Sequence, residues 1–187
     1  MSKVTFEDDL PPRRRWLRGA GLSALAIVLL LSAAALALWV LVRTGSPPLQ
    51  LAEDVSVTVV DRHERLLRAF TTTDGRWRLP VEARDVDPRY LAMLTAFEDR
   101  RFHSHGGVDP KALLRAALQL VRHRRVVSGA STLTMQTARL LDGTHERSGA
   151  GKLRQIVRAL QLERRLTKPQ ILSLYLHLAP FGGNLEG

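Results

Sequence analysis

The sequence contains no cysteine, and only 5% of its 187 residues are Phe, Trp or Tyr. The absence of cysteine excludes a disulfide-stapled secreted module and a thiolate metal site. So few aromatic side chains argue against a stacking platform for nucleic-acid bases. The serine-nucleophile motifs G-x-S-x-G, S-x-x-K and K-T-G are missing as well. Acidic residues are outnumbered, because 18 Asp and Glu face 28 Lys and Arg, and the net charge is +10.

One long stretch lacks charge altogether. Residues 19–42 read GAGLSALAIVLLLSAAALALWVLV, which as a helix spans about 36 Å and exceeds the roughly 30 Å core of a bilayer. This stretch excludes a freely soluble chain, and its length favours an uncleaved signal-anchor over a cleaved signal peptide. Four arginines precede it and only Arg43 follows directly. The positive-inside rule therefore predicts a cytoplasmic N-terminus and an external remainder.

These features predict four segments. We expect a cytoplasmic basic head over residues 1–18, a transmembrane signal-anchor helix over 19–42, a linker over 43–54 and a domain over 55–187. The predicted location is the inner (cytoplasmic) membrane, crossed once, with the domain on the periplasmic or extracellular side. A basic domain beside a membrane has phosphates or anionic lipid headgroups as natural partners, whereas nucleic acid is a poor candidate outside the cell.

The external domain should be mainly helical after a small β segment. Val55–Val60 alternates as a strand does, and Leu66–Phe70 and Trp77–Leu79 are predicted to form a hairpin around residues 73–75. Asp-Pro pairs, hydroxyl caps and apolar residues at helical spacing then predict helices over 88–97, 111–124 and 132–141, one around Leu153–Leu160, and a last one opened by the capping box Thr167-x-x-Gln170.

Two acidic or histidine-containing clusters are candidate sites. Glu98-Asp99 ends a predicted helix beside a glycine turn, where partial burial gives a carboxylate the properties of a general base. Taken locally, the pair is more typical of solvated acids bonded to Arg100 and Arg101. His103 and His105, with Asp109 nearby, suggest a metal site, but side chains two positions apart diverge on a helix, and a structural role is favoured.

A basic cluster and a hydroxyl-rich turn offer a third candidate site. The turn Gly129–Thr134 suits an anion, and it suits an ordinary helix cap equally well. Arg139, Arg147 and Lys152 follow, a set that fits a phosphate or diphosphate on an external face. The alternative is a solubilising basic face.

Three blocks of sequence resemble a known enzyme family. They are EDRRFHSHGGVD from Glu98 to Asp109, GASTLTMQTAR from Gly129 to Arg139, and KLRQIVRALQLERRLTKPQILSLYLHLAPFGG from Lys152 to Gly183. In this order they resemble the family 51 glycosyltransferases, the peptidoglycan polymerases of class A penicillin-binding proteins, over about residues 55–187.

The resemblance implies a mainly α, lysozyme-like transglycosylase domain lying against the outer leaflet. Its substrates would be lipid II and the growing glycan strand, joined by an inverting β-1,4 transfer that releases undecaprenyl diphosphate. By position, Glu98 would be the general base that deprotonates the acceptor 4-hydroxyl. The implied substrate-binding residues are Asp99, Ser131, Thr132, Gln136, Arg139, Arg147, Lys152 and Gln155.

The resemblance also implies that no cofactor is required, although a Mg or Mn ion assists some members and Asp99 is the residue placed to bind it. Gln155 stands where the family has a second glutamate, and Met135 where it has a glutamine. Because the sequence stops at Gly187, we expect a domain that is incomplete at its C-terminus. A non-catalytic, membrane-anchored module that binds lipid II or cell-wall proteins is therefore the second hypothesis, and a hydrolase on a lysozyme-like fold the third.

Overall fold

The computed structural model describes residues 12–125, 129–143 and 148–187, and the chain divides into two units after Leu41. The described part of the first unit, residues 12–41, belongs to helix α1 (Pro12–Thr44). Its stretch Leu22–Thr44 is apolar, with a mean hydropathy of 2.8, and none of it is buried in the protein. This confirms an apolar helix long enough to cross a bilayer. The helix begins at Pro12, inside the predicted head, and the limits of the predicted segments remain predictions.

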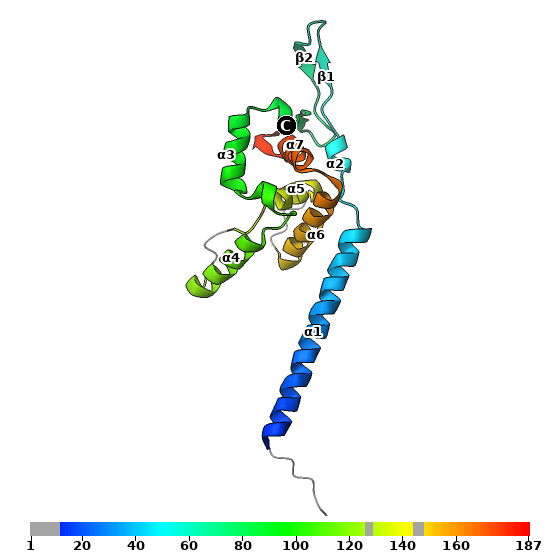
Figure 1. The fold of residues 1–187 in the computed structure, drawn as a ribbon. Helices are drawn as coiled ribbons and strands as arrows, with labels where there is room; N and C mark the ends of the chain where they lie inside the picture. Colours follow the sequence, from blue (N-terminus) through cyan, green and yellow to red (C-terminus); the bar gives the residue numbers. More distant parts are fainter. Residues whose placement is uncertain (1–11, 126–128, 144–147) are drawn as a thin grey trace, which may run out of the picture. The chain divides into compact units, whose positions relative to one another are not determined.

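The second unit is mainly helical, as predicted, with two small sheets (Figure 1). Its helices are α2 (Gln50–Glu53), α3 (Pro88–Glu98), α4 (Pro110–His123), α5 (Leu133–Asp142), α6 (Gly149–Arg165) and α7 (Lys168–Leu178). Short 3-10 turns occupy Ala83–Asp85 and Phe102–Ser104. The strands are β1 (Thr58–Val60), β2 (Leu66–Ala69), β3 (Trp77–Arg78), β4 (Pro180–Gly182) and β5 (Leu185–Glu186).

The helices begin at the caps that the sequence indicates. Asp87 accepts the Arg89 N–H with Pro88 in the first turn, and Asp109 accepts two N–H groups at the start of α4. Thr132 caps α5, and the capping box of Thr167 and Gln170 is formed at α7. Each cap pairs backbone donors that a helix leaves unsatisfied.

The predicted hairpin is wrong in its pairing. Strand β2 pairs antiparallel with β1, which precedes it, and Asp61 closes the turn by accepting the N–H groups of His63 and Arg65. The chain does turn again at residues 72–76, where the Gly75 N–H donates to the Thr72 carbonyl. However, β3 pairs in parallel with the distant strand β5, so Trp77 faces Leu185 and not β2.

Arg78 holds the C-terminal strand onto the domain. Its side chain is 1% exposed, and its Nε lies 2.6 Å from Glu186 Oε2. Its Nη1 donates to the carbonyls of Leu51 and Asp54. Because a buried guanidinium is tolerated only when its charge and donors are paired, this residue joins α2, β3 and β5 into one structure.

Helix α5 is the centre of the helical body and lies between α6 and α7 (Figure 1). One buried cluster joins two segments that precede α5, and the first residue of α5, to α7; a second joins α5 to α6 and to the end of α7. The first comprises Ala83, Phe102, Leu133, Ile171, Leu172 and Leu176, and the second Ala138, Leu141, Leu162 and Leu178. The core thus fixes α5, from which the candidate site is built.

Gly107 has a position that only glycine fits. Its φ is +93°, and a Cβ there would lie 2.9 Å from both the Ala159 carbonyl oxygen and Glu163 Cγ. We expect Gly107→Ala to destabilise the domain by about 2–3 kcal/mol, because backbone must move and the left-handed conformation is strained. The measurement is the urea midpoint for loss of tertiary structure in the detergent-solubilised chain. Gly106→Ala is the matched control, since a Cβ there has no atom within 4 Å; equal midpoints for the two variants would contradict this packing.

Candidate active site

The two helices α3 and α5 place an acid and an amide in direct contact. Glu98 is the last residue of α3, and its Oε2 accepts a hydrogen bond of 2.9 Å from Gln136 Nε2 on α5. Both side chains are partly buried. The amide fixes the direction of the carboxylate, whose other oxygen, Oε1, forms no hydrogen bond among the described residues. The structure thus brings these two candidate site residues together.

Asp99 is buried, and its carboxylate forms hydrogen bonds inside the protein. Its side chain is 4% exposed, and its oxygens lie 3.0 Å from His105 Nε2. One of them also accepts the N–H of Leu133, the first residue of α5, at 3.0 Å. A buried carboxylate at a helix N-terminus is favoured by the helix dipole. Asp99 therefore joins the end of α3 to the start of α5, directly behind Glu98.

Neither Arg100 nor Arg101 neutralises this acidic pair within the described residues. Arg101 instead binds Asp109 through Nε and Nη2, at 2.9 and 2.6 Å. Burial would raise the pKa of Asp109, but the N–H of Ala112 and the guanidinium of Arg101 outweigh it and lower that pKa. The alternative of a solvated acidic pair bonded to its neighbouring arginines is not what the structure contains.

One of the predicted cations, Lys152, contacts Ser131. Lys152 Nζ on α6 lies 2.5 Å from Ser131 Oγ and 3.5 Å from Gln155 Oε1. Burial lowers the pKa of Lys152, and the positive charge of Arg139 lowers it further. Arg139 lies one turn after Gln136 on α5 and is exposed. Ser131, Arg139, Lys152 and Gln155 thus form one basic group, whereas Arg147 lies outside the described residues.

Tyr175 on α7 belongs to the same site, although the sequence analysis did not single it out. Burial raises the pKa of its hydroxyl, and the negative charge of Glu98 raises it further, while Arg139 acts in the opposite direction. Tyr175 therefore lies within electrostatic reach of both the acid and a cation. The one available signal is that it has the only polar tip on an apolar helix face that contains Ile171, Leu174 and Leu178.

A cavity of about 610 Å³ opens beside Glu98 and has a mostly polar lining. Ser131 is exposed there, whereas Thr132 is 2% exposed and uses its hydroxyl to donate to the Gly107 carbonyl and to accept the Met135 N–H. Arg100 and Arg115 also line it, and neither forms an ion pair within the described residues. The cavity therefore offers a base and unpaired cations to an anionic ligand.

Among the residues that the structure describes, no group of three or more His, Asp or Glu side chains converges. His105 contacts Asp99, and Asp109 binds Arg101. An ion on Asp99 would compete with His105 for the same oxygens.

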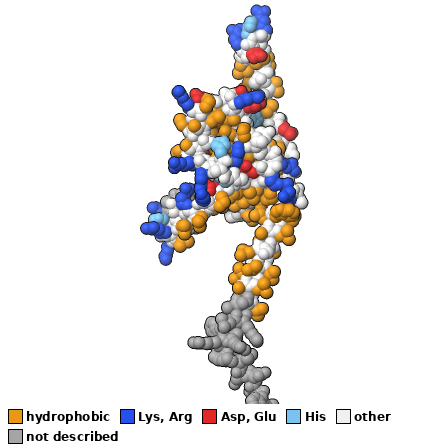
Figure 2. All heavy atoms as spheres, in the orientation of Figure 1, with side chains coloured by type: hydrophobic (Ala, Val, Ile, Leu, Met, Phe, Trp, Pro, Cys, Tyr) orange, Lys and Arg blue, Asp and Glu red, His pale blue; other side chains and the backbone are white. Residues whose placement is uncertain are grey.

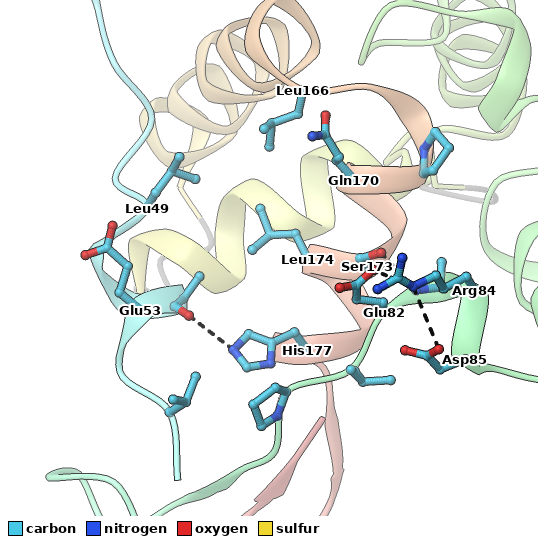
Figure 3. A pocket seen from close by; sticks show the side chains of 16 residues that line it. Leu49, Glu53, Glu82, Arg84, Asp85, Leu166, Gln170, Ser173, Leu174 and His177 are labelled. Carbon is cyan, nitrogen blue, oxygen red and sulfur yellow. Dashed lines mark hydrogen bonds and ion pairs between the residues drawn. The ribbon is translucent and has the colours of Figure 1, made fainter. Parts of the chain in front are cut away.

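A second cavity lies elsewhere. It measures about 880 Å³ and is bounded by α2, residues 80–85 and α7 (Figure 3). His177 lies on its wall, and its two ring nitrogens face the carbonyls of Leu79 and Ala52 at 3.1 and 3.2 Å. None of the predicted site residues lines this cavity, so it is separate from the candidate active site.

Residues 63–187 match the transglycosylase family, and the chain belongs to it. This match contains the acid of α3, the polar face of α5 and the lysine of α6 described above.

Individual relatives are penicillin-binding proteins. The chain is 47% identical to penicillin-binding protein 1C of Escherichia coli (strain K12) over 176 residues, which are 94% of the chain and 22% of that protein. It is 41% identical to penicillin-binding protein 1A of Pseudomonas aeruginosa over 59% of the chain and 13% of the relative, and 35% identical to penicillin-binding protein 4 of Bacillus subtilis over 71% and 19%. The chain thus spans about a fifth of the length of these curated relatives.

The electrostatic coupling within the basic group is measurable without substrate. We expect Lys152 to lose its proton below the ordinary value of 10.5, because burial and Arg139 both disfavour the ammonium form. Arg139→Gln should raise the pKa of Lys152 part of the way back, since burial remains. NMR of 13C-methylated lysines against pH measures this, with Lys152→Arg assigning the signal. Arg139→Lys keeps the charge and serves as control. If the pKa of Lys152 is unchanged in Arg139→Gln, the two residues are not electrostatically coupled.

Proposed function

We propose that this chain is a peptidoglycan glycosyltransferase that polymerises lipid II into β-1,4-linked glycan strands for the cell wall. The observation that carries the proposal is the 2.9 Å hydrogen bond between Glu98 and Gln136, one helical turn from Arg139. The carboxylate is oriented by this bond, and Glu98 and Arg139 both lie within electrostatic reach of Tyr175. Support comes from the family membership and from the cavity that contains Glu98.

Glu98 acts as the general base. The 4-hydroxyl of the acceptor sugar loses its proton to the carboxylate while its oxygen attacks the anomeric carbon of the growing strand. The bond to the diphosphate oxygen breaks, and the α-linkage becomes a β-1,4 linkage. Gln136 holds one carboxylate oxygen, so the other is directed to the proton. This arrangement reduces the reorganisation that the transfer needs.

The basic group stabilises the leaving group. Undecaprenyl diphosphate gains negative charge as the sugar departs, and fixed cations lower the energy of that charge. Arg139 and Lys152 supply them, Ser131 and Gln155 add hydrogen bonds, and Arg147 is proposed to join them. Asp99 and Thr132 act by holding α5 in place. The proposed reaction needs no cofactor, and a Mg or Mn ion that assisted it would bind at Asp99.

The external domain has apolar surface suited to a bilayer. On α3, Met93 is 68% and Phe97 88% exposed, and Leu114, Leu118 and Val121 are exposed along α4. Figure 2 shows hydrophobic and basic side chains side by side along α4. We propose a single-pass protein of the inner membrane with a cytoplasmic N-terminus and the domain against the outer leaflet. Further proposed partners are other cell-wall synthesis proteins.

We expect Glu98→Gln to abolish polymer formation while affinity for lipid II falls little. Loss of a positioned general base costs about 10²–10⁴-fold in rate, whereas the amide keeps the shape and the contact with Gln136. Glycan chains made from labelled lipid II and binding to lipid II are measured on the same preparation. The matched control is Glu53→Gln, an exposed acid on α2.

The outcomes separate the three hypotheses. Binding without polymer in the wild-type chain would favour the non-catalytic module, and cleavage of preformed glycan would favour the hydrolase. The hydrolase has less support, because glycan hydrolysis has no anionic leaving group for the basic group to stabilise. If Glu98→Gln forms polymer at the wild-type rate, Glu98 is not the general base.

Gln155 provides an independent test, since a glutamate at this position would contact Lys152 through a charged oxygen. We expect Gln155→Glu to weaken binding of the donor diphosphate several-fold, because the added negative charge neutralises Lys152. The measurement is the KM for lipid II, with Gln119→Glu on α4 as a charge-matched control. An unchanged KM would show that the residue at this position does not contribute to substrate binding.

A further inference from the structure

Helix α6 contacts the segment that leaves the apolar helix. Arg164 Nη1 donates to the Val42 carbonyl at 2.6 Å, and Arg165 Nη2 donates to Ser46 Oγ at 2.8 Å. Arg158 donates to the Ser46 carbonyl. Val42 is in the last turn of α1, where four carbonyls lack partners within a helix. A guanidinium supplies such a carbonyl with a donor and has the charge that a helix C-terminus favours.

These contacts fix the depth of the arginines if the apolar helix crosses the bilayer. The apolar stretch ends at Thr44, so the Val42 carbonyl is about 3 Å along the axis from that end. A headgroup layer is roughly 5–8 Å thick on each side of the hydrocarbon. A guanidinium within hydrogen-bond distance of Val42 or Ser46 therefore lies at the level of the lipid phosphates.

The positive charges of the two terminal arginines of α6 are not neutralised by a carboxylate in the described part of the chain. Arg164 and Arg165 are exposed, and neither forms an ion pair with a carboxylate in the described part of the chain. Arg158 differs, because Asp142 lies 3.7 Å from it and Gln161 accepts from it. Neighbouring Glu163 is already bound by Lys168 at 2.6 Å.

We propose that Arg164 and Arg165, at the C-terminal end of α6, form a binding site for the phosphate of an anionic phospholipid headgroup. Each guanidinium uses one donor on the segment 42–46 and has others for the phosphate oxygens, a geometry that arginine provides and lysine provides less well. The lipid would then link α6 to the point where the chain leaves the membrane. This site is distinct from the candidate active site and does not depend on transferase activity.

The test is lipid retention by the full chain. The protein in a neutral detergent is mixed with equal amounts of phosphatidylglycerol and phosphatidylcholine, and bound lipid is counted by native mass spectrometry. We expect the wild type to retain phosphatidylglycerol preferentially. Arg164→Gln/Arg165→Gln should weaken that retention by about fivefold for each cation removed. Arg164→Lys/Arg165→Lys should keep most of it, since the charges remain.

The control removes two charges elsewhere. Arg62→Gln/Arg68→Gln changes the net charge equally on the exposed β1–β2 hairpin, and we expect wild-type lipid retention. If this control loses as much phosphatidylglycerol as the Arg164→Gln/Arg165→Gln variant, overall charge explains the effect and the proposed site is wrong. A wild type that retains both lipids equally would also overturn the proposal. Resistance of every variant to alkaline extraction from membranes verifies that the chain still spans the bilayer.

Discussion

The Asp99 carboxylate joins the two helices of the candidate active site, and the rest of the site depends on this contact. It accepts the first N–H of α5 and binds His105, so the end of α3 cannot move independently of α5. Glu98 immediately precedes it and is thereby fixed within reach of Gln136. A charge buried to 4% exposure is costly unless its hydrogen bonds are complete. This cost restrains the junction, because any displacement would leave the carboxylate unpaired.

Helix α5 separates structural from chemical roles along its length. Thr134, Met135, Thr137 and Ala138 are buried, whereas Gln136 and Arg139 face the site. The methionine at the position of a family glutamine is therefore core packing here. Burial lowers the pKa of Lys152 on α6, and the positive charge of Arg139 on α5 lowers it further, so the two cations repel each other. An anionic ligand would relieve that repulsion, which is consistent with the proposed diphosphate ligand.

The sequence predicted those features whose causes are local. Asp-Pro caps and a capping box act over three or four residues, and their helices are found where expected. The prediction of a hairpin between β2 and β3 was wrong because the partner of β3 is β5, more than a hundred residues later. No local sequence pattern indicates the buried Arg78–Glu186 pair. The role of Asp99 was missed for the same reason, because its partners come from two other segments. Tyr175 lies on an apolar helix face, and that pattern predicts packing and gives no indication of a role for the hydroxyl.

The basic surplus of the chain has a pattern that its composition alone does not reveal. Arg65, Arg78 and Arg101 are paired with carboxylates and serve the fold. Arg139, Arg164 and Arg165 have no carboxylate partner among the described residues, and Lys152 contacts only neutral oxygens. Two of the places where the described residues leave cations without a carboxylate partner are the basic group on α5 and α6 and the C-terminal end of α6. The two proposed ligands, a lipid-linked diphosphate and a phospholipid headgroup, both present phosphate close to the bilayer surface, so the two proposals depend on the same physical property: cations without a carboxylate partner among the described residues.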